Sequence, residues 1–311
     1  MEPILQIDHL SISFTQYGKG FHQRELPVIR DLSLSLNPGE VTAILGASGS
    51  GKSLLAHAIL GLLPYNSHQE GTILYEGQPL TLSRIQKLRG KEIVLVPQGV
   101  TYLDPLMKVG HQLQKGRRDK IAKEKTKNAL SRYGLGDNTA DLYPFQLSGG
   151  MARRVLMASA VMDTPRLIIA DEPTPGLDAR SAARILGHFR ELAADGAAVL
   201  FITHDLELAL AVANRVAVFY AGETVEVAQV SDFQENKLRH PFTKALWDAL
   251  PQRGLHSLPG AQPYPGEVEE GCPFFGQCPH PRDECAQGKI PLRSLSNGIV
   301  RCLYPSGEVE A

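Results

Sequence analysis

Short runs of β-branched and aliphatic residues recur along the chain, bounded by Gly, Pro or Asn. Six of these runs predict strands, at residues 5–10, 41–45, 93–96, 167–170, 199–203 and 215–220. Other segments carry apolar side chains at the three- and four-residue spacing of a helix, at residues 54–63, 152–162 and 181–194. The alternation of strands with helices predicts an α/β fold with a largely parallel, buried sheet.

The chain has 311 residues, of which 43% are hydrophobic, which is enough for one large domain and a smaller addition. Its apolar runs are strand-sized, far from the about 18 residues that a membrane-spanning helix needs. The N-terminal residues Met1–Ile4 lack the basic and then apolar order of a secretory signal, so we expect a cytosolic protein. A net charge of −1 gives no overall field that would attract nucleic acid, and we expect no such partner.

Residues 105–135 differ from the rest of the chain in charge. They hold nine Lys or Arg and two Asp or Glu, a local charge of 9 − 2 = +7. Two interpretations stay open, a solvated helical face or a surface that docks a partner or lies near anionic lipid headgroups.

The amino-acid composition changes again after Pro251. Nine of the 21 prolines lie in residues 251–311, and all four cysteines fall in the last 40 residues. We therefore divide the chain into a domain at 1–250 and a loop-rich C-terminal extension at 251–311. The spacing Cys-x5-Cys-x6-Cys-x16-Cys lacks the close pairs of structural zinc sites and suits a [4Fe–4S] cluster, with Zn²⁺ and uncoordinated thiols or disulfides as alternatives. The candidate ligands are Cys272, Cys278, Cys285 and Cys302.

Residues 46–53 fit the phosphate-loop pattern G-x-x-x-x-G-K-[ST] and lie between a predicted strand and a predicted helix. Backbone N–H groups of such a loop bind phosphate oxygens, Lys52 adds a charge at the β and γ phosphates, and the Ser53 hydroxyl ligates Mg²⁺. The pattern predicts a site for a nucleoside triphosphate. Its candidate residues are Gly46, Ser48, Gly49, Ser50, Gly51, Lys52 and Ser53.

An acidic pair follows the apolar run at 167–170. Asp171 is the second candidate Mg²⁺ ligand, and Glu172 is the candidate general base that accepts a proton from the attacking water. Gln98 and His204 also follow predicted strands, so we expect both at the same carboxyl edge of the sheet. There, Gln98 would contact Mg²⁺ or the attacking water, and His204 would contact the γ-phosphate and position Glu172.

The order of these motifs carries a family resemblance. The phosphate loop, Gln98, Leu147–Met151 (Leu-Ser-Gly-Gly-Met), Asp171–Glu172, the turn at 176–178 and His204 occur in the order found in nucleotide-binding subunits of ABC transporters. Residues 4–250 resemble that family. The resemblance implies a P-loop NTPase of ABC type with a RecA-like core, an antiparallel β subdomain and a helical subdomain at about 99–163.

The resemblance also implies a mechanism. Two such subunits meet head to tail, and the Leu-Ser-Gly-Gly segment of each closes over the ATP that the other's phosphate loop holds. Ser148, Gly149, Gly150 and Asp178 are then the candidate contacts across that interface. Phe14 is the candidate residue for stacking on adenine, with Tyr17 as its rival.

The segment His240–Leu246, followed by Pro251 and the cysteines, resembles the oligopeptide, dipeptide and nickel importer subgroup, in which some extensions bind an iron–sulfur cluster. This implies an ATPase that powers uptake of peptides, nickel or metal chelates, and residues 98–105 look closer to the nickel or chelate type. The implied partners are a second homologous ATPase subunit, two membrane permeases and an extracytoplasmic substrate-binding protein. In this family the helical subdomain, which contains residues 105–135, faces the permeases, so the resemblance favours the docking interpretation of that basic segment. The implied location is the cytoplasmic face of the membrane.

Two other classes of protein fit these motifs less well: a non-transport ABC ATPase, of the DNA-repair or translation-associated kind, and a P-loop kinase. Non-transport ABC ATPases of DNA repair insert long coiled coils between the two halves of the cassette, whereas only 48 residues separate Gln98 from Leu147. Translation-associated ABC proteins carry two cassettes in one chain, and this chain has one. A P-loop kinase would leave Leu147–Met151 and His204 without a role.

Overall fold

The computed structural model describes residues 2–17, 22–47, 49–256, 260–268, 270–295 and 298–306. The chain forms two compact units, which are described separately. The first comprises the described residues of Met1–Asn37, Thr42–Leu80 and Ile202–Ala311, and the second comprises Pro38–Val41 and Thr81–Phe201. This partition differs from the sequence-based division at residue 250, which stays a prediction.

A long antiparallel layer begins the first unit. β1 (Leu5–Tyr17) pairs with β2 (Gln23–Leu36) on one side and with β4 (Ser67–Tyr75) on the other, and β5 (Gln78–Pro79) extends the edge. Leu5, Ile7, Leu10 and Ile12 on β1 are completely buried, with polar residues between them. The sequence-based prediction missed β2 and β4, which begin with polar, largely exposed residues.

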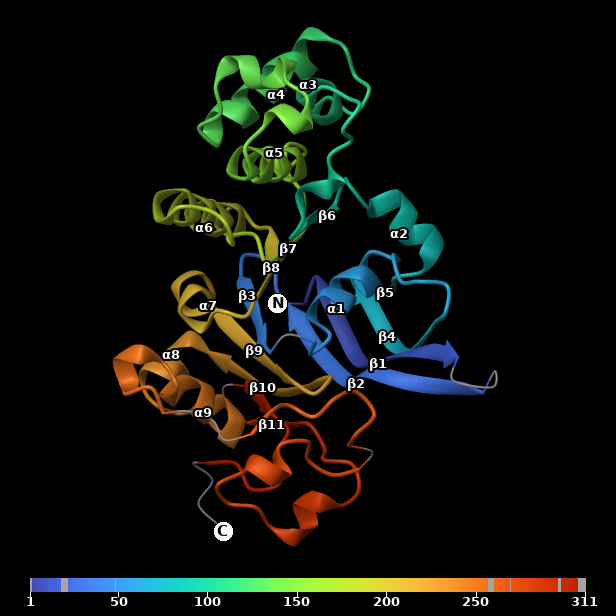
Figure 1. Cartoon of the computed structure of the whole chain (residues 1–311), viewed down its shortest axis with the longest axis vertical. Helices are drawn as coiled ribbons and strands as arrows, with labels where there is room; N and C mark the ends of the chain where they lie inside the picture. The colour runs from blue at the N-terminus through green and yellow to red at the C-terminus, as the bar shows by residue number, and fades with distance from the viewer. Residues whose placement is uncertain are drawn as a thin grey trace. The chain divides into compact units, whose positions relative to one another are not determined.

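The rest of the first unit's sheet runs from β2 through β10 (Glu223–Gln229) and β9 (Arg215–Tyr220) to β3 (Val41–Gly46). β3 and β9 are parallel, and every residue of β3 is buried. Figure 1 shows the helices α8 (Val230–Gln234) and α9 (Pro241–Asp248) beside β10. The remaining helices of this unit are α1 (Lys52–Ile59) and α7 (Leu206–Val212).

The second unit contains the parallel pair β6 (Ile93–Val96) and β7 (Leu167–Asp171), of which β6 is the edge strand. β8 (Ala198–Thr203) lies next to β7, and its residues up to Phe201 belong to this unit. The edge-on contact of Phe189 with Phe201, with ring centroids 5.9 Å apart, lies in its core. Its helices are α2 (Leu82–Leu88), α3 (Val109–Leu113), α4 (Lys120–Arg132), α5 (Gly149–Val161) and α6 (Ala179–Ala194), with short 3₁₀ turns at Val100–Tyr102, Asp137–Asp141 and Pro144–Gln146.

All six predicted strands are confirmed, five of them within one residue at each end, whereas β1 continues seven residues beyond its predicted end. The predicted helices are also present, but each begins two or three residues earlier than expected. Their first turns precede the first apolar position because capping residues such as Ser148 and Asp178 begin the helix. The sequence pattern missed β10, because Glu223 and Glu226 interrupt its apolar run although both are buried.

The basic segment 105–135 is largely paired within its own unit. Ion pairs of 2.6–3.6 Å join five of its nine cations to carboxylates outside the segment. Asp163 alone receives Lys115 and Arg117. Four carboxylates outside the segment therefore offset part of its local charge of +7.

The described residues of the extension form short elements. These are 3₁₀ turns at Pro251–Arg253, Phe275–Gln277 and Asp283–Ala286 and the strands β11 (Arg293–Leu295) and β12 (Gly298–Val300). β12 pairs antiparallel with β10, with Glu226 opposite Val300. The extension is therefore hydrogen-bonded to the sheet of the first unit.

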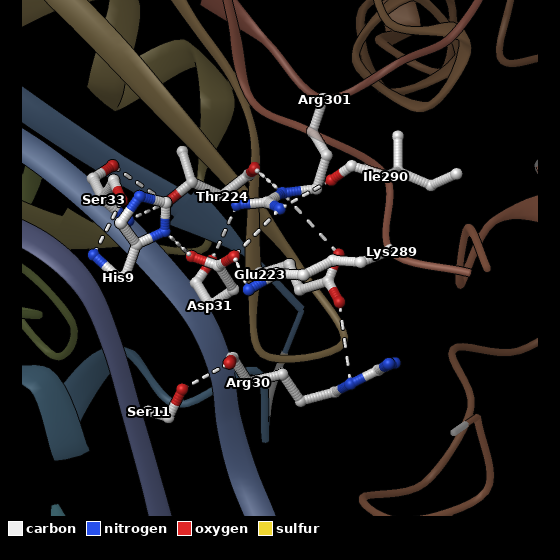
Figure 2. A network of polar contacts seen from close by, with 10 residues as sticks. All are labelled: His9, Ser11, Arg30, Asp31, Ser33, Glu223, Thr224, Lys289, Ile290 and Arg301. Carbon is white, nitrogen blue, oxygen red and sulfur yellow. Dashed lines mark hydrogen bonds and ion pairs between the residues drawn. The ribbon is translucent and has the colours of Figure 1, made fainter. Parts of the chain in front are cut away.

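A buried polar network holds the extension on the sheet (Figure 2). Arg301, 3% exposed, donates to a carboxylate oxygen and to the backbone oxygen of Asp31 at 3.3 and 3.0 Å and to the Thr224 carbonyl at 3.0 Å. Lys289 and His9 approach the same Asp31 carboxylate at 2.7 and 2.9 Å. Burial raises the pKa of Asp31, but Lys289, Arg301 and His9 together outweigh it and lower the pKa below its usual value.

We expect Arg301→Gln to loosen the extension. Breaking a buried ion pair costs about 3–5 kcal/mol, because the remaining charge stays buried with fewer partners. The expected loss in free energy of unfolding is about 3 kcal/mol, measured by thermal denaturation and by limited proteolysis after Pro251. Lys289→Gln is the matched control, since the Lys289 side chain is 71% exposed and its pair should contribute about 0–1 kcal/mol. Equal effects of the two substitutions would contradict a buried anchor.

Candidate functional site

The phosphate loop of the first unit connects the buried strand β3 to α1. Gly49 and Gly51 have φ values of 82° and 91°, a left-handed conformation that residues with a Cβ rarely adopt. A Cβ on Gly51 would also lie 2.8 Å from the Ile29 side chain. The two glycines thus let the backbone turn tightly against β2, which is the shape that an anion-binding loop needs.

Lys52 is the first residue of α1 and is 7% exposed. Its ammonium group donates to the carbonyl oxygens of Gly46 and Ala47, both at 2.8 Å. The positive charge of Lys52 therefore lies against the backbone of the phosphate loop. Ser53 is exposed beside it, Ser50 is buried beneath it, and Ser48 lies outside the described residues.

In the second unit, two of the predicted site residues are in direct contact. β6 and β7 are parallel with Val96 opposite Ala170, so Gln98 and Glu172 follow neighbouring strand ends. The Gln98 side-chain amide donates to Glu172 Oε2 at 2.8 Å. Glu172 has a φ of 42°, an unfavourable conformation for a residue with a Cβ, which turns the chain sharply after the buried Asp171. The sequence-based expectation that these residues gather at one sheet edge holds within this unit.

Arg153 on α5 joins both of these segments and was missed at the sequence level. Its guanidinium donates to the Gln98 carbonyl at 2.6 Å and to the Glu172 carbonyl at 3.2 Å. Burial lowers the pKa of Arg153, and the Glu172 carboxylate opposes that effect. The basic pair that follows Leu-Ser-Gly-Gly-Met is the sequence signal that could have drawn attention to it.

The candidate dimer contacts of the second unit lie at two helix N-termini. Ser148 caps α5, and its hydroxyl oxygen accepts the Met151 N–H at 3.2 Å. Gly149 is the first residue of that helix and is exposed. Asp178 caps α6 and accepts from the backbone and the hydroxyl of Ser181 at 2.9 and 2.7 Å, and these hydrogen bonds lower the pKa of its carboxyl group. Both ends present N–H groups suited to anions.

The remaining candidates belong to the first unit. His204 is exposed, directly after the end of β8. Phe14 is half-buried on β1 opposite Leu26 of β2, whereas Tyr17 is 69% exposed at the end of the same strand. The geometry leaves the choice between Phe14 and Tyr17 open.

All four cysteines are free thiols and line one cavity of the extension. Apolar side chains form much of its remaining wall, among them Phe274, Phe275, Ile290 and Leu303. Burial raises the pKa of Cys272 to about 12, and the nearby Cys302 and Cys278 add to that rise. The separated thiols of the sequence are thus neighbours in space, and a bound cation would be needed to keep them ionised together.

The described residues contain no preformed metal site. Within the described part of the chain, no three or more His, Cys, Asp or Glu side chains are close enough to share one ion. A single zinc ion draws four sulfurs into a tight tetrahedron. In a polynuclear cluster each thiolate binds a different iron, so the sulfurs stand farther apart around the cluster. Four thiols that line one cavity are the donor set that either group would use.

The extension also reaches the phosphate loop. Gly49 lines a small pocket together with Val28 of β2, Gly222 and the extension residues Gln262–Gly266. Gln277 holds this segment in place by donating to the Ala261 carbonyl at 2.6 Å and to the Tyr220 hydroxyl at 3.2 Å. Tyr220 in turn packs edge-on against Phe274 of the cysteine cavity, with ring centroids 5.5 Å apart. A continuous set of contacts therefore connects the cysteine cavity to the phosphate loop.

A phosphate loop after a buried strand, a Gln–Glu pair at adjacent strand ends and a Ser-capped glycine helix start together define an ATP-binding cassette. Comparison with known proteins agrees. Residues 29–175 match the family model described as ABC transporter, and residues 225–285 match the one described as oligopeptide/dipeptide transporter, C-terminal region. The chain belongs to the family of ATP-binding subunits of ABC transporters, and it is an ATPase.

Its relatives match over most of their length. The dipeptide transport ATP-binding protein DppD of Bacillus subtilis is 36% identical over 90% of this chain and 88% of its own. The oligopeptide transport ATP-binding protein OppD of Haemophilus influenzae is 32% identical over 99% of both chains. DppD of Escherichia coli is 34% identical over 97% of both.

Solved structures share the cassette fold. A dimeric post-hydrolysis state of the ATP-binding cassette MJ0796 bound to ADP and Pi superposes with a TM-score of 0.64 at 25% identity, covering 73% of this chain and 98% of that one. Among the residues that the structure describes, none of the helices is both long and apolar enough to cross a membrane.

We expect Arg153→Met to slow ATP turnover more than it weakens ATP binding. Without the guanidinium, the segments that carry Gln98 and Glu172 lose their shared donor, and small displacements of reacting groups cost about tenfold or more in rate. Steady-state assays of the assembled transporter would show kcat falling with KM changed by less than about threefold, and Arg153→Lys should recover part of kcat.

The neighbouring substitution Arg154→Met is the matched control. Arg154 donates to the carbonyls of Gly150, Tyr133 and Gly134, away from the Gln98–Glu172 pair. Arg154→Met should lower the thermal stability of the protein, and it should lower kcat less than Arg153→Met does. An equal drop in kcat for both arginines would show that α5 acts only as a general support.

Proposed function

We propose that this protein hydrolyses ATP to power the import of peptides through a membrane transporter. The observation that carries the proposal is the Gln98–Glu172 hydrogen bond of 2.8 Å at adjacent strand ends, in a chain that also holds a complete phosphate-loop pattern. The names of the relatives above mention dipeptides and oligopeptides. The expectation of nickel or metal chelates as cargo receives no support from them.

The binding step rests on the phosphate loop. ATP and Mg²⁺ are expected ligands of an ABC ATPase. We assign Lys52 to the β and γ phosphates, since its ammonium already lies across the loop and can exchange two carbonyl acceptors for phosphate oxygens. We assign Ser53 and Asp171 to Mg²⁺, with Gln98 as a further oxygen ligand, because hydroxyl, carboxylate and amide oxygens suit this hard cation.

The hydrolytic step rests on Glu172. Its carboxylate accepts a proton from the attacking water while the Gln98 amide holds the carboxylate in place. Arg153 acts as a positioning residue, since it contacts only the backbone carbonyls of these two residues. His204 is assigned to the γ-phosphate. These roles need no covalent intermediate, because phosphoryl transfer to water depends on positioning and charge stabilisation.

The assembly follows from the helix termini. Ser148, Gly149, Gly150 and Asp178 are proposed to contact ATP held by a second, homologous ATPase subunit, with donors and the positive helix end directed at phosphate. Ser148 keeps its hydroxyl proton for this purpose, since its oxygen is the acceptor in the cap. The other proposed partners are two permeases and a substrate-binding protein, which place the subunit at the cytoplasmic face of the membrane.

We propose that Cys272, Cys278, Cys285 and Cys302 hold a [4Fe–4S] cluster that staples the extension. The shared cavity, the free thiols and a sequence spacing that lacks the close Cys pairs of structural zinc sites support this assignment over Zn²⁺. The family descriptions and the relatives' names mention no cluster, so the assignment depends on the cavity and the cysteine spacing. A cluster would supply cross-links to a segment whose described residues form regular elements of no more than four residues.

Transport by the reconstituted complex tests the central proposal. With its binding protein, the wild-type transporter in proteoliposomes should accumulate a labelled dipeptide in an ATP-dependent manner and leave Ni²⁺ outside. Glu172→Gln should lower hydrolysis and uptake by about 10²–10⁴-fold and retain bound ATP, because only the base is lost. Lys52→Ala should instead weaken ATP binding by more than about tenfold. Undiminished hydrolysis in Glu172→Gln would exclude Glu172 as the base.

Chemical analysis tests the cluster. Protein purified without oxygen should be brown and contain about four iron and four sulfide per chain, as a [4Fe–4S] group requires. Cys302→Ser should lower both contents and make the extension easier to cleave, with ATP affinity changed less than the iron content. Colourless protein with one equivalent of zinc would contradict the assignment.

A further inference from the structure

His240 occupies a buried position between the cassette and the extension. It is 1% exposed and caps α9, where its ring Nδ1 accepts the Phe242 N–H at 3.0 Å. A neutral histidine has one protonated and one bare ring nitrogen, and the bare nitrogen is the acceptor. Its ring proton therefore lies on Nε2.

That Nε2 donor is buried without a hydrogen-bond partner among the described residues. A buried donor without an acceptor costs about 1–3 kcal/mol, and such groups are rare in folded proteins. His240 is also one of the residues that line the cavity of the four cysteines. An acceptor bound in that cavity would satisfy the donor that the protein itself leaves unsatisfied.

The orientation of the ring is fixed from two sides. The backbone N–H groups of Arg239 and His240 donate to the two carboxylate oxygens of Glu226 on β10, each at 2.9 Å. The Phe274 ring lies 6.0 Å from the His240 ring and belongs to the turn that follows Cys272. With Nδ1 committed to the helix cap, the ring has little freedom to turn Nε2 elsewhere.

We propose that His240 donates a hydrogen bond from Nε2 to a sulfur of the iron–sulfur cluster, an inference that rests on the cluster assigned above to the four cysteines. A hydrogen bond to a cluster or cysteine sulfur stabilises the more negative, reduced form and raises the reduction potential. His240 is thus a tuning residue of the extension, and it connects the cluster's charge state to the first turn of α9.

The test separates the cap from the donor. In His240→Asn, the shorter side chain can still accept the Phe242 N–H as a helix cap, but its amide no longer reaches the cavity. We expect full iron and sulfide content with an equilibrium constant for one-electron reduction about tenfold lower, which corresponds to about 59 mV, in a titration followed by electron paramagnetic resonance of the reduced cluster. His240→Gln, whose longer amide reaches the cavity, should recover most of the shift.

His280→Asn is the matched control. His280 lines the same cavity but is exposed, so the same chemical change there should leave the potential unchanged. A cluster-loaded His240→Asn protein with wild-type potential, or an equal shift in both histidine variants, would overturn the hydrogen bond. If His240→Asn loses its cluster, His240→Gln is compared with the wild type alone. A reduction potential of His240→Gln that lies about 59 mV or more below the wild-type value would then overturn the role. Wild-type protein without iron and sulfide would instead overturn the cluster, and with it this inference.

Discussion

The buried contact between Arg301 and Asp31 is the constraint on which the arrangement of the last 60 or so residues depends. A guanidinium that is 3% exposed must have acceptors inside the protein, and Asp31, Thr224 and Ile290 provide them from two strands of the cassette and from the extension itself. With this residue fixed, β12 lies along β10 and the cysteine loops close around one cavity. The extension thus derives its place from charge satisfaction more than from a hydrophobic core of its own.

The same physical rule operates at the proposed hydrolytic site. Arg153, Gln98 and Glu172 come from a helix and two strand ends, and each meets a polar partner from another segment. Two parallel strands place Gln98 and Glu172 side by side, and the strained backbone at Glu172 turns its side chain toward that partner. Positioning of this kind is what phosphoryl transfer to water requires, because the protein contributes orientation and charge and forms no covalent bond.

The cysteine cavity of the extension differs chemically from the ATP-binding cassette to which the extension is attached. The cavity, the buried histidine and the contact of the extension with the phosphate loop all lie within the first unit. The contacts through Tyr220, Gln277 and Gln262–Gly266 provide a physical connection between the cysteines and Gly49.

The sequence by itself determined the strands that are buried on both faces, the phosphate loop, the acidic pair and the resemblance to ABC subunits, because continuous apolar runs and glycine patterns are local properties of the chain. It did not reveal β2, β4 or β10, whose polar and charged residues hide the pattern, nor the ion pairs that offset part of the charge of the basic segment 105–135. Arg153, Arg301 and His240 acquired their roles only from the tertiary structure, since each depends on partners far away in the chain. A buried polar group must find such a partner, and which partner it finds is decided by packing and not by spacing.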